Sequence, residues 1–110
     1  EIASIAEDFD AACWKLGAII GCGLHIAEAV PVSIGLFIAA RGDPNRAIIG
    51  AVNLGGDSDS VATIVGSICG AYAGFERVDL RLYQQVSEVN AIDLPSIANR
   101  IATLARKRAS

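Results

Sequence analysis

The chain has 110 residues, of which 53% are hydrophobic, and a formal net charge of −3. That length suffices for one domain or part of one. The acidic balance argues against nucleic acid as the main partner, because binding phosphates requires a basic face.

Helical periodicity recurs along the whole chain, and no run shows the period of two that is typical of a strand. Five or six helices are expected, with candidates over residues 2–20, 25–40, 44–52, 58–73, 79–90 and 93–107. Pro31 falls inside the second candidate, which predicts either a kink or a start close to that residue. Between the second and third candidates, Gly42 suits a helix end, Asp43 an N-cap and Pro44 a first helical position.

The candidate helix over residues 58–73 has two different faces. One face carries apolar residues at helical spacing: Val61, Ile64, Val65, Ile68, Cys69 and Tyr72. The other carries a glycine every four residues: Gly66, Gly70 and Gly74. This pattern predicts that a neighbouring helix comes very close and that the helix is buried nearly all round.

Packing roles are expected for several other large side chains. Tyr72 is interpreted as a core residue, and Trp14 as a packing residue in preference to one that stacks on an adenine. The inward-facing residues of the last two candidate helices are expected to be Leu82, Tyr83, Val86, Leu94, Ile97, Ile101 and Leu104. His25 and Glu28 are interpreted as surface or capping residues.

Three features bear on compartment, membrane insertion and completeness. Cys13, Cys22 and Cys69 lie far apart with no CxxC spacing, which argues against disulfides or a zinc site and for a reducing, cytoplasmic compartment. The uncharged run over residues 29–40 is too short to cross a bilayer, so no membrane segment is expected. The chain contains no methionine and begins at Glu1, so we expect it to derive from a longer polypeptide.

The most informative segment is Asn53-Leu54-Gly55-Gly56-Asp57-Ser58-Asp59-Ser60. Asp57 alone could cap the following helix, where negative charge is favoured by about 0.3–1 kcal/mol. A cap needs one oxygen, however, whereas Asp57, Asp59 and Ser60 together offer several hard oxygen ligands. Such ligands suit Mg²⁺, Mn²⁺ or Ca²⁺. Both interpretations, a cap and a metal site, remain open at this point.

Several other loop motifs are excluded. An EF-hand starting at Asp57 would need glycine and glutamate where the chain has Ala62 and Ile68. The chain has no GxxxxGK[ST] phosphate loop, and Gly21-Cys22-Gly23 lacks the third glycine of a dinucleotide fingerprint. No serine–histidine–acid constellation is evident around His25.

Residues 53–62, followed by residues 66–74, resemble the C-terminal signature of the ADP-ribosylglycohydrolase family, which includes the dinitrogenase-reductase-activating glycohydrolase. The pattern there reads approximately N-x-G-G-D-[ST]-D-[ST]-x-A and then G-x-x-x-G-A-x-x-G, at this spacing. The resemblance implies an all-α fold, a multi-helix orthogonal bundle. Residues 1–110 would then form the C-terminal part of a single domain whose N-terminal part is absent from this chain.

The resemblance also implies a metal-dependent hydrolase that cleaves the glycosidic bond of ADP-ribosylated substrates at a binuclear Mg²⁺ or Mn²⁺ centre. Carried over residue by residue, Asp57, Asp59 and Ser60 would be metal ligands. Gly55 and Gly56 would shape the loop that faces the substrate. The implied small-molecule or protein partner is an ADP-ribose-type compound or an ADP-ribosylated protein.

The sequence departs from the family pattern in two respects. The second acidic cluster of the family, of Ser/Thr-Asp-Asp type, has no counterpart here, so the catalytic residue is unknown and activity is expected only with a complementary N-terminal polypeptide segment. Val78-Asp79 and Tyr83 stand where many relatives have Ile-Pro and then Trp, which indicates a divergent branch. Two alternatives stay open: a related N-glycosidase acting on a nucleoside-like substrate, and a non-catalytic helical assembly module.

Overall fold

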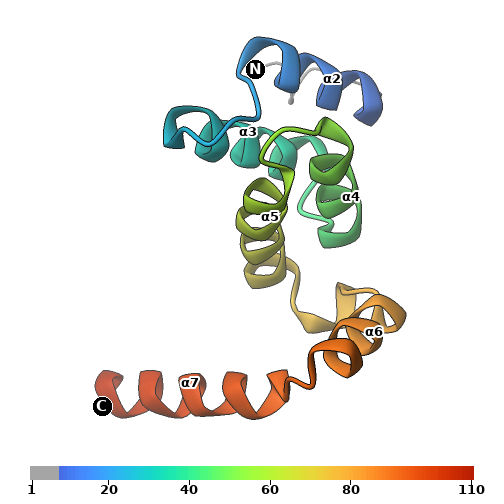
Figure 1. Cartoon of the computed structure of the whole chain (residues 1–110). Coiled ribbons are helices and arrows are strands. Elements are labelled where there is room, and N and C mark those ends of the chain that lie inside the picture. Colours follow the sequence, from blue (N-terminus) through green and yellow to red (C-terminus); the bar gives the residue numbers. More distant parts are fainter. Residues whose placement is uncertain (1–7) are drawn as a thin grey trace. The chain divides into compact units, whose positions relative to one another are not determined.

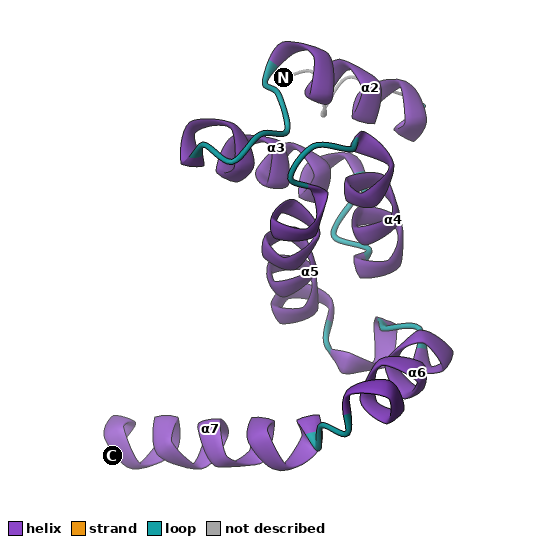
Figure 2. Cartoon of the chain, in the orientation of Figure 1, coloured by secondary structure: helices purple, strands orange, loops and turns teal. Residues whose placement is uncertain are grey.

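The computed structural model describes residues 8–110, and all regular structure in that range is helical (Figures 1 and 2). The α-helices are α2 (Phe9–Ile19), α3 (Ile26–Ala39), α4 (Pro44–Leu54), α5 (Ser58–Ala73), α6 (Leu80–Asn90) and α7 (Leu94–Ala109), and a short 3₁₀ helix, η1 (Phe75–Arg77), follows α5. The predicted all-α class is therefore confirmed. The first predicted helix extended back to residue 2, but residues 2–7 lie outside the described part of the chain.

The helix boundaries follow from local sequence signals. Asp43 accepts hydrogen bonds from two first-turn N–H groups of α4, and Pro44 supplies the first helical residue, as predicted. Because α3 begins at Ile26 and continues through Pro31, the alternative of a start near that proline is excluded.

The chain divides into two compact units, Glu1–Val78 and Asp79–Ser110. The first contains α2 to α5 and η1, and the second contains α6 and α7. Assignment of residues 1–110 to the C-terminal part of one domain stays a prediction. Over the described residues, every helix is too short or too polar to cross a lipid bilayer.

The core of the first unit lies where α3, α4 and α5 meet, with α2 packed on α3 and α4 (Figure 1). Leu36 and Val32 of α3 and Val61 and Val65 of α5 are fully buried. Burying a side chain of this size contributes about 1.5–3 kcal/mol. The residues that α4 buries in this core are small. Ala47 and Ala51 are also fully buried. This pattern of large residues against small ones lets α4 lie close beside α5.

A buried hydroxyl joins α3 to α5. Ser33 has no exposed surface, and its Oγ donates to the carbonyl oxygen of Ala29 at 2.7 Å. The same Oγ lies 3.4 Å from the carbonyl oxygen of Val61 on α5. A serine whose hydroxyl donates to a carbonyl oxygen of its own helix can be buried at little cost in free energy. Here the same hydroxyl also lies close to the backbone of α5.

The closest helix contacts lie at glycines that the sequence analysis did not single out. A Cβ atom on Gly35 of α3 would lie 2.5 Å from Cδ2 of Leu16, and one on Gly50 of α4 would lie 2.8 Å from Cζ of Phe9. On the predicted glycine face of α5, a Cβ atom on Gly66 would lie 3.2 Å from Cδ1 of Ile48, so this glycine does allow a close contact. A Cβ on Gly70 would meet nothing within 4 Å, so the prediction of close packing along that whole face is wrong.

Several predicted burial roles are also wrong in this structure. Tyr72 is 72% exposed and touches Phe37 edge-on, with ring centroids 5.4 Å apart, and Trp14 is 75% exposed. α5 is therefore not buried all round. Predicted inward-facing residues of α6 and α7 are at least 37% exposed: Leu82, Val86, Leu94, Ile97, Ile101 and Leu104. Apolar periodicity defines which face of a helix is hydrophobic, but it does not supply the element that covers it.

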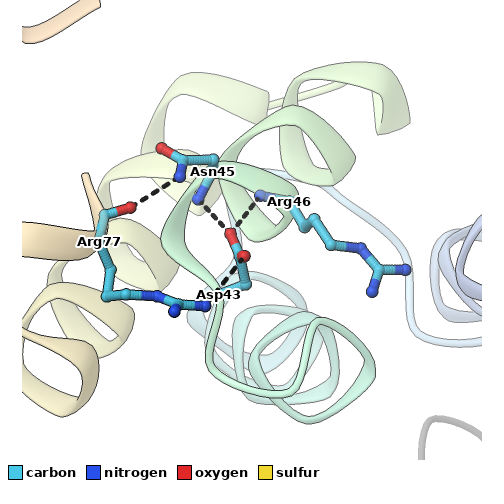
Figure 3. A network of polar contacts seen from close by, with 4 residues as sticks. All are labelled: Asp43, Asn45, Arg46 and Arg77. Carbon is cyan, nitrogen blue, oxygen red and sulfur yellow. Dashed lines mark hydrogen bonds and ion pairs between the residues drawn. The ribbon is translucent and has the colours of Figure 1, made fainter. Parts of the chain in front are cut away.

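A polar network joins η1 to the start of α4 within the first unit (Figure 3). Oδ1 of Asp43 accepts from the backbone N–H groups of Asn45 at 2.9 Å and Arg46 at 3.1 Å. Oδ2 of Asp43 lies 3.9 Å from the guanidinium of Arg77. The side-chain amide of Asn45 in turn donates to the carbonyl oxygen of Arg77 at 2.7 Å. One carboxylate thus caps a helix and helps to hold the segment that follows α5.

We predict that Asp43→Ala lowers the free energy of unfolding by about 1 kcal/mol, because the α4 cap is lost. Asp43→Asn should retain most of the stability, since asparagine also caps helices well. Arg77→Ala should cost only about 0–1 kcal/mol, because the ion pair is exposed to solvent. Urea denaturation followed by circular dichroism measures all three variants. An equal loss in Asp43→Ala and Asp43→Asn would contradict the capping role.

Candidate metal centre

The glycine pair between α4 and α5 makes the sharp turn predicted for it. Gly55 has a φ of 74° and a ψ of −160°, a conformation that is essentially restricted to glycine. Gly56 follows with a φ of 63°. Together these residues reverse the chain within two positions and bring Asp57 to the start of α5.

A second loop lies directly against this turn. The backbone N–H of Asp57 donates to the carbonyl oxygen of Cys22 at 2.7 Å. A Cβ atom on Gly56 would lie only 2.0 Å from that same oxygen, so any other residue would separate the two loops. The contact fixes Asp57 relative to residues 21–23, which connect α2 to α3.

Glu28 holds the second loop in place. Its Oε2 accepts a hydrogen bond at 2.7 Å from the backbone N–H of Gly23, five residues earlier. Burial raises the pKa of the Cys22 thiol, and the negative charges of Asp57 and then Glu28 raise that pKa further. Both carboxylates therefore lie near the thiol, and Glu28 is part of the surroundings of the candidate site.

Sequence reasoning placed Glu28 at the surface or in a cap, and the structure shows a more specific role. The Gly21–Gly23 segment was excluded only as a nucleotide fingerprint, and its contact with the Gly56 turn was missed. No local signal reveals a contact between residues 22 and 57. The histidine at position 25 is exposed and forms the N-cap of α3 without a side-chain capping bond, so its predicted surface location is confirmed.

Asp57 occupies the N-cap position of α5, but its side chain makes no capping hydrogen bond. Four other helices in the described range begin with an aspartate whose carboxylate does accept from its own first turn: Asp8, Asp43, Asp79 and Asp93. The interpretation of Asp57 as a simple cap is therefore not supported by its geometry. Its half-buried carboxylate thus makes no hydrogen bond to the first turn of α5.

The other two predicted ligands lie in the first turn of α5. Asp59 is exposed and Ser60 is half-buried. Residues 57 and 60 are three positions apart and therefore lie on the same side of the helix start. The donor set of carboxylate and hydroxyl oxygens fits a hard divalent cation such as Mg²⁺ or Mn²⁺. The positive end of the α5 dipole offsets part of the repulsion between the two carboxylates.

This donor set is only part of a metal site. Within residues 8–110, no group of three or more His, Cys, Asp or Glu side chains is arranged to hold a metal ion. The residues fit the predicted metal in kind but are too few to surround it. No catalytic acid or base emerges from the described residues either.

Two pockets share Trp14 and Leu54 as walls, and the first of them also includes Gly56 of the glycine turn. The first has a volume of about 340 Å³ and is lined by Trp14, Gly17, Ala18, Cys22, Leu54 and Gly56. The second has a volume of about 410 Å³ and is lined by Asp10, Cys13, Trp14, Gly50, Asn53 and Leu54. The sequence analysis interpreted Trp14 as a packing residue, so these pockets were not anticipated.

Comparison with known proteins gives one family and several relatives. The family described as ADP-ribosylglycohydrolase matches residues 2–110. The uncharacterized protein YegU of Escherichia coli (strain K12) is 33% identical over 103 residues, which cover 94% of this chain and 31% of that protein. ADP-ribosylhydrolase ARH3 of Homo sapiens and of Bos taurus are each 36% identical over 69 residues, covering 54% of this chain and 19% of theirs. The chain thus spans less than a third of the length of these relatives. No solved structure matches.

We predict that Gly56→Ala destabilises the protein more than Gly55→Ala does. Both changes place a side chain on a backbone with positive φ, but only the first drives a Cβ atom against the Cys22 carbonyl. Amide hydrogen exchange should show faster exchange of the Asp57 N–H in Gly56→Ala, because its hydrogen bond is broken. Gly70→Ala is the control, and it should stabilise by about 0.5–1 kcal/mol because this helix-interior glycine has open space around it. Unchanged Asp57 exchange in Gly56→Ala would contradict the described contact between the loops.

Proposed function

Because this chain belongs to the ADP-ribosylglycohydrolase family, we propose that it forms the C-terminal part of a divalent-metal-dependent hydrolase that cleaves a glycosidic bond to ribose. The ARH3 relatives, named as ADP-ribosylhydrolases, support ADP-ribosylated substrates as the class, either an ADP-ribose-type small molecule or an ADP-ribosylated protein. The chain would supply one side of the active site.

The observation that carries this proposal is the unused cap at the start of α5. Asp57 makes no side-chain bond to its helix, although it occupies the position where other aspartates of this chain do so. Asp59 adds a second carboxylate two residues later. Two negative charges this close repel each other unless a positive charge lies nearby, and the helix dipole contributes only about half an elementary charge. A divalent cation would supply the positive charge that the helix dipole does not.

Each residue of the turn then has a role. Asp57, Asp59 and Ser60 would hold Mg²⁺ or Mn²⁺ in a binuclear centre, whose chemistry when bound is to polarise the substrate and lower the pKa of water. Gly55 and Gly56 carry no side chains, so the ribose can approach the backbone closely at this point. The Cys22 carbonyl and Glu28 keep the turn in position through the hydrogen bonds described above.

The remaining ligands and the group that moves the proton are proposed to come from a complementary N-terminal polypeptide segment. The chain spans 31% of YegU, and the described residues provide only part of a ligand set. We therefore expect activity only when the two parts are combined. A cytoplasmic location stays a prediction that rests on the free thiols of Cys13, Cys22 and Cys69.

A second candidate activity is N-glycosidase action on a nucleoside-like substrate. The specific observation in its favour is the pocket lined by Trp14, which lies against Gly56 and therefore beside the proposed ribose position. A third interpretation, a non-catalytic assembly module, predicts that Asp57 and Asp59 can be changed without effect on metal binding.

We predict that Asp57→Asn and Asp59→Asn each weaken Mn²⁺ binding by about tenfold or more. Replacing even a residue that only hydrogen-bonds to a metal ligand typically lowers metal affinity by about that factor. Ser60→Ala should also weaken binding, whereas Ser60→Thr keeps the hydroxyl and should retain it. Titration followed by electron paramagnetic resonance of free Mn²⁺ measures the affinity.

Asp93→Asn is the matched control for this experiment. It removes the same charge from the start of another helix, where the side chain caps Ser96 at 3.0 Å, and asparagine can keep that bond. Mn²⁺ affinity should be unchanged in this variant. Equal loss in Asp93→Asn and Asp57→Asn would show a general charge effect and would contradict the proposed ligands.

A further inference from the structure

The end of the loop between α2 and α3 gains little from side-chain burial. Leu24 is 85% exposed, and His25 after it is exposed as well. The position of such a segment depends mainly on the hydrogen bonds of its backbone, because few apolar contacts hold it. Two of these hydrogen bonds meet at one peptide group, the one that joins Cys22 to Gly23.

This Cys22–Gly23 peptide is bound on both of its edges. Its carbonyl oxygen accepts from the N–H of Asp57 at 2.7 Å. Its N–H donates to Oε2 of Glu28, also at 2.7 Å. The C=O and N–H groups of a trans peptide lie in one plane and point in opposite directions. Glu28 and Asp57 therefore hold the peptide from opposite sides, and rotating its plane would disturb both hydrogen bonds.

Helix α3 places Glu28 for this contact. Glu28 is the third residue of the helix, where a glutamate commonly folds back onto the N–H of its own N-cap residue. Here Oε2 reaches past the N-cap, His25, to the N–H of Gly23 two positions earlier. The carboxylate thus links the start of α3 to the loop that precedes it.

Two glycines make room for the carboxylate. A Cβ atom on Gly21 would lie 2.7 Å from Oε2 of Glu28, and one on Gly23 would lie 2.5 Å from the same oxygen. A side chain at either position would therefore push the carboxylate away from the loop. The Gly21-Cys22-Gly23 segment, which is no nucleotide fingerprint, lets the loop close around a half-buried carboxylate.

We propose that Glu28 is a positioning residue for the start of α5, and that it orients Asp57 through the Cys22–Gly23 peptide. A carboxylate that accepts from a peptide N–H polarises that peptide and makes its carbonyl oxygen a better acceptor. The hydrogen bond from the Asp57 N–H is thereby strengthened. This inference rests on the proposed function, in which the Asp57 carboxylate is a metal ligand. A ligand on a well-held backbone binds a metal more tightly, because less freedom is lost on binding.

A purely electrostatic role for Glu28 is the alternative explanation. After burial, the negative charges of Asp57 and then Glu28 raise the pKa of the Cys22 thiol, so both carboxylates act on the same small region. The charge of Glu28 could then attract a cation toward Asp57 without any part played by the peptide. The two explanations need different properties of the side chain. Positioning needs an acceptor with the reach of Glu28, whereas attraction needs only the negative charge.

Substitutions at Glu28 separate these explanations through Mn²⁺ affinity, with circular dichroism to confirm that each variant is folded. Glu28→Gln should retain most of the affinity, since its amide oxygen can still accept from Gly23. Glu28→Asp keeps the charge but is one methylene shorter, and Glu28→Ala has no acceptor. Both should weaken Mn²⁺ binding by about tenfold. A greater loss in Glu28→Gln than in Glu28→Asp would show that charge decides the affinity and would overturn the proposal.

Glu88→Ala is the matched control for the loss of one negative charge. Glu88 is an exposed glutamate in the interior of another helix, α6. Its removal should leave both the Mn²⁺ affinity and the Asp57 amide unchanged. A loss in Glu88→Ala equal to that in Glu28→Ala would show a general charge effect and would contradict a role specific to Glu28.

Nuclear magnetic resonance of the metal-free chain tests the positioning directly. The Asp57 amide proton should shift upfield and exchange faster in Glu28→Ala and Glu28→Asp, because its acceptor is less well held. Glu28→Gln should resemble the wild type. Changes confined to the Gly23 amide, with the Asp57 amide unaltered in every Glu28 variant, would overturn the proposal.

Gly23→Ala tests the same contacts from the peptide side. Gly23 has no positive φ, so its backbone accepts alanine, and the three atoms nearest the new Cβ all belong to the flexible end of Glu28. The variant should therefore fold while the carboxylate is displaced from the Gly23 N–H. Asp57 exchange should rise as in Glu28→Ala and should rise no further in the double variant, since both changes break one interaction. Additive effects would overturn the proposal.

These measurements keep the inference apart from the proposed function. Mn²⁺ binding that depends on Asp57 but is equal in all Glu28 variants overturns the positioning role and leaves the proposed function standing. Absence of Mn²⁺ binding in the wild type overturns the metal-dependent function. The Asp57 amide then still decides whether Glu28 acts through the peptide.

Discussion

The hydrogen bond from the Asp57 N–H to the Cys22 carbonyl oxygen is the contact on which the candidate site depends. It joins the turn between α4 and α5 to the loop between α2 and α3, two segments that are 35 positions apart in the sequence. Because Gly56 has no side chain, the two backbones can meet at 2.7 Å. Glu28 supports the loop from the other side through the Gly23 N–H. The pairing therefore helps to place the start of α5 relative to the loop before α3.

The helices around this contact pack closely where small residues face larger ones. Gly35 and Gly50 let Leu16 and Phe9 approach to distances that a Cβ atom would forbid, and Ala47 and Ala51 are fully buried on α4. Interiors packed this closely tolerate changes of volume poorly. The packed first unit therefore positions two loops, and the proposed site residues lie on and next to these loops.

Helix boundaries could be predicted because their signals are local. Asp43 with Pro44, and the predicted start at residue 93, mark helix starts that the structure confirms, since a cap involves only residues within the first turn. Burial could not be predicted in the same way. Tyr72, Trp14 and the apolar residues of α6 and α7 follow helical spacing, but their exposure depends on what else packs against that face. The motif indicated Asp57, Asp59 and Ser60 because these residues are neighbours in the sequence. The contacts of Cys22 and Glu28 near them join distant parts of the chain, so only the folded structure reveals them.

The start of α5 differs from the starts of the other described helices that have an aspartate at the N-cap, α2, α4, α6 and α7, because in those the carboxylate accepts from the first turn. A helix leaves its first N–H groups without backbone partners, and a side-chain cap normally accepts one or two of them. Asp57 does not do so, which leaves the positive end of α5 beside two carboxylates and a hydroxyl. The chain loses the stabilisation of a side-chain cap, typically about 1 kcal/mol, at a helix start that lies against the Cys22 loop. This loss supports the proposal that the Asp57 carboxylate has another partner, and a donor set of carboxylate and hydroxyl oxygens is of the kind that suits a divalent cation.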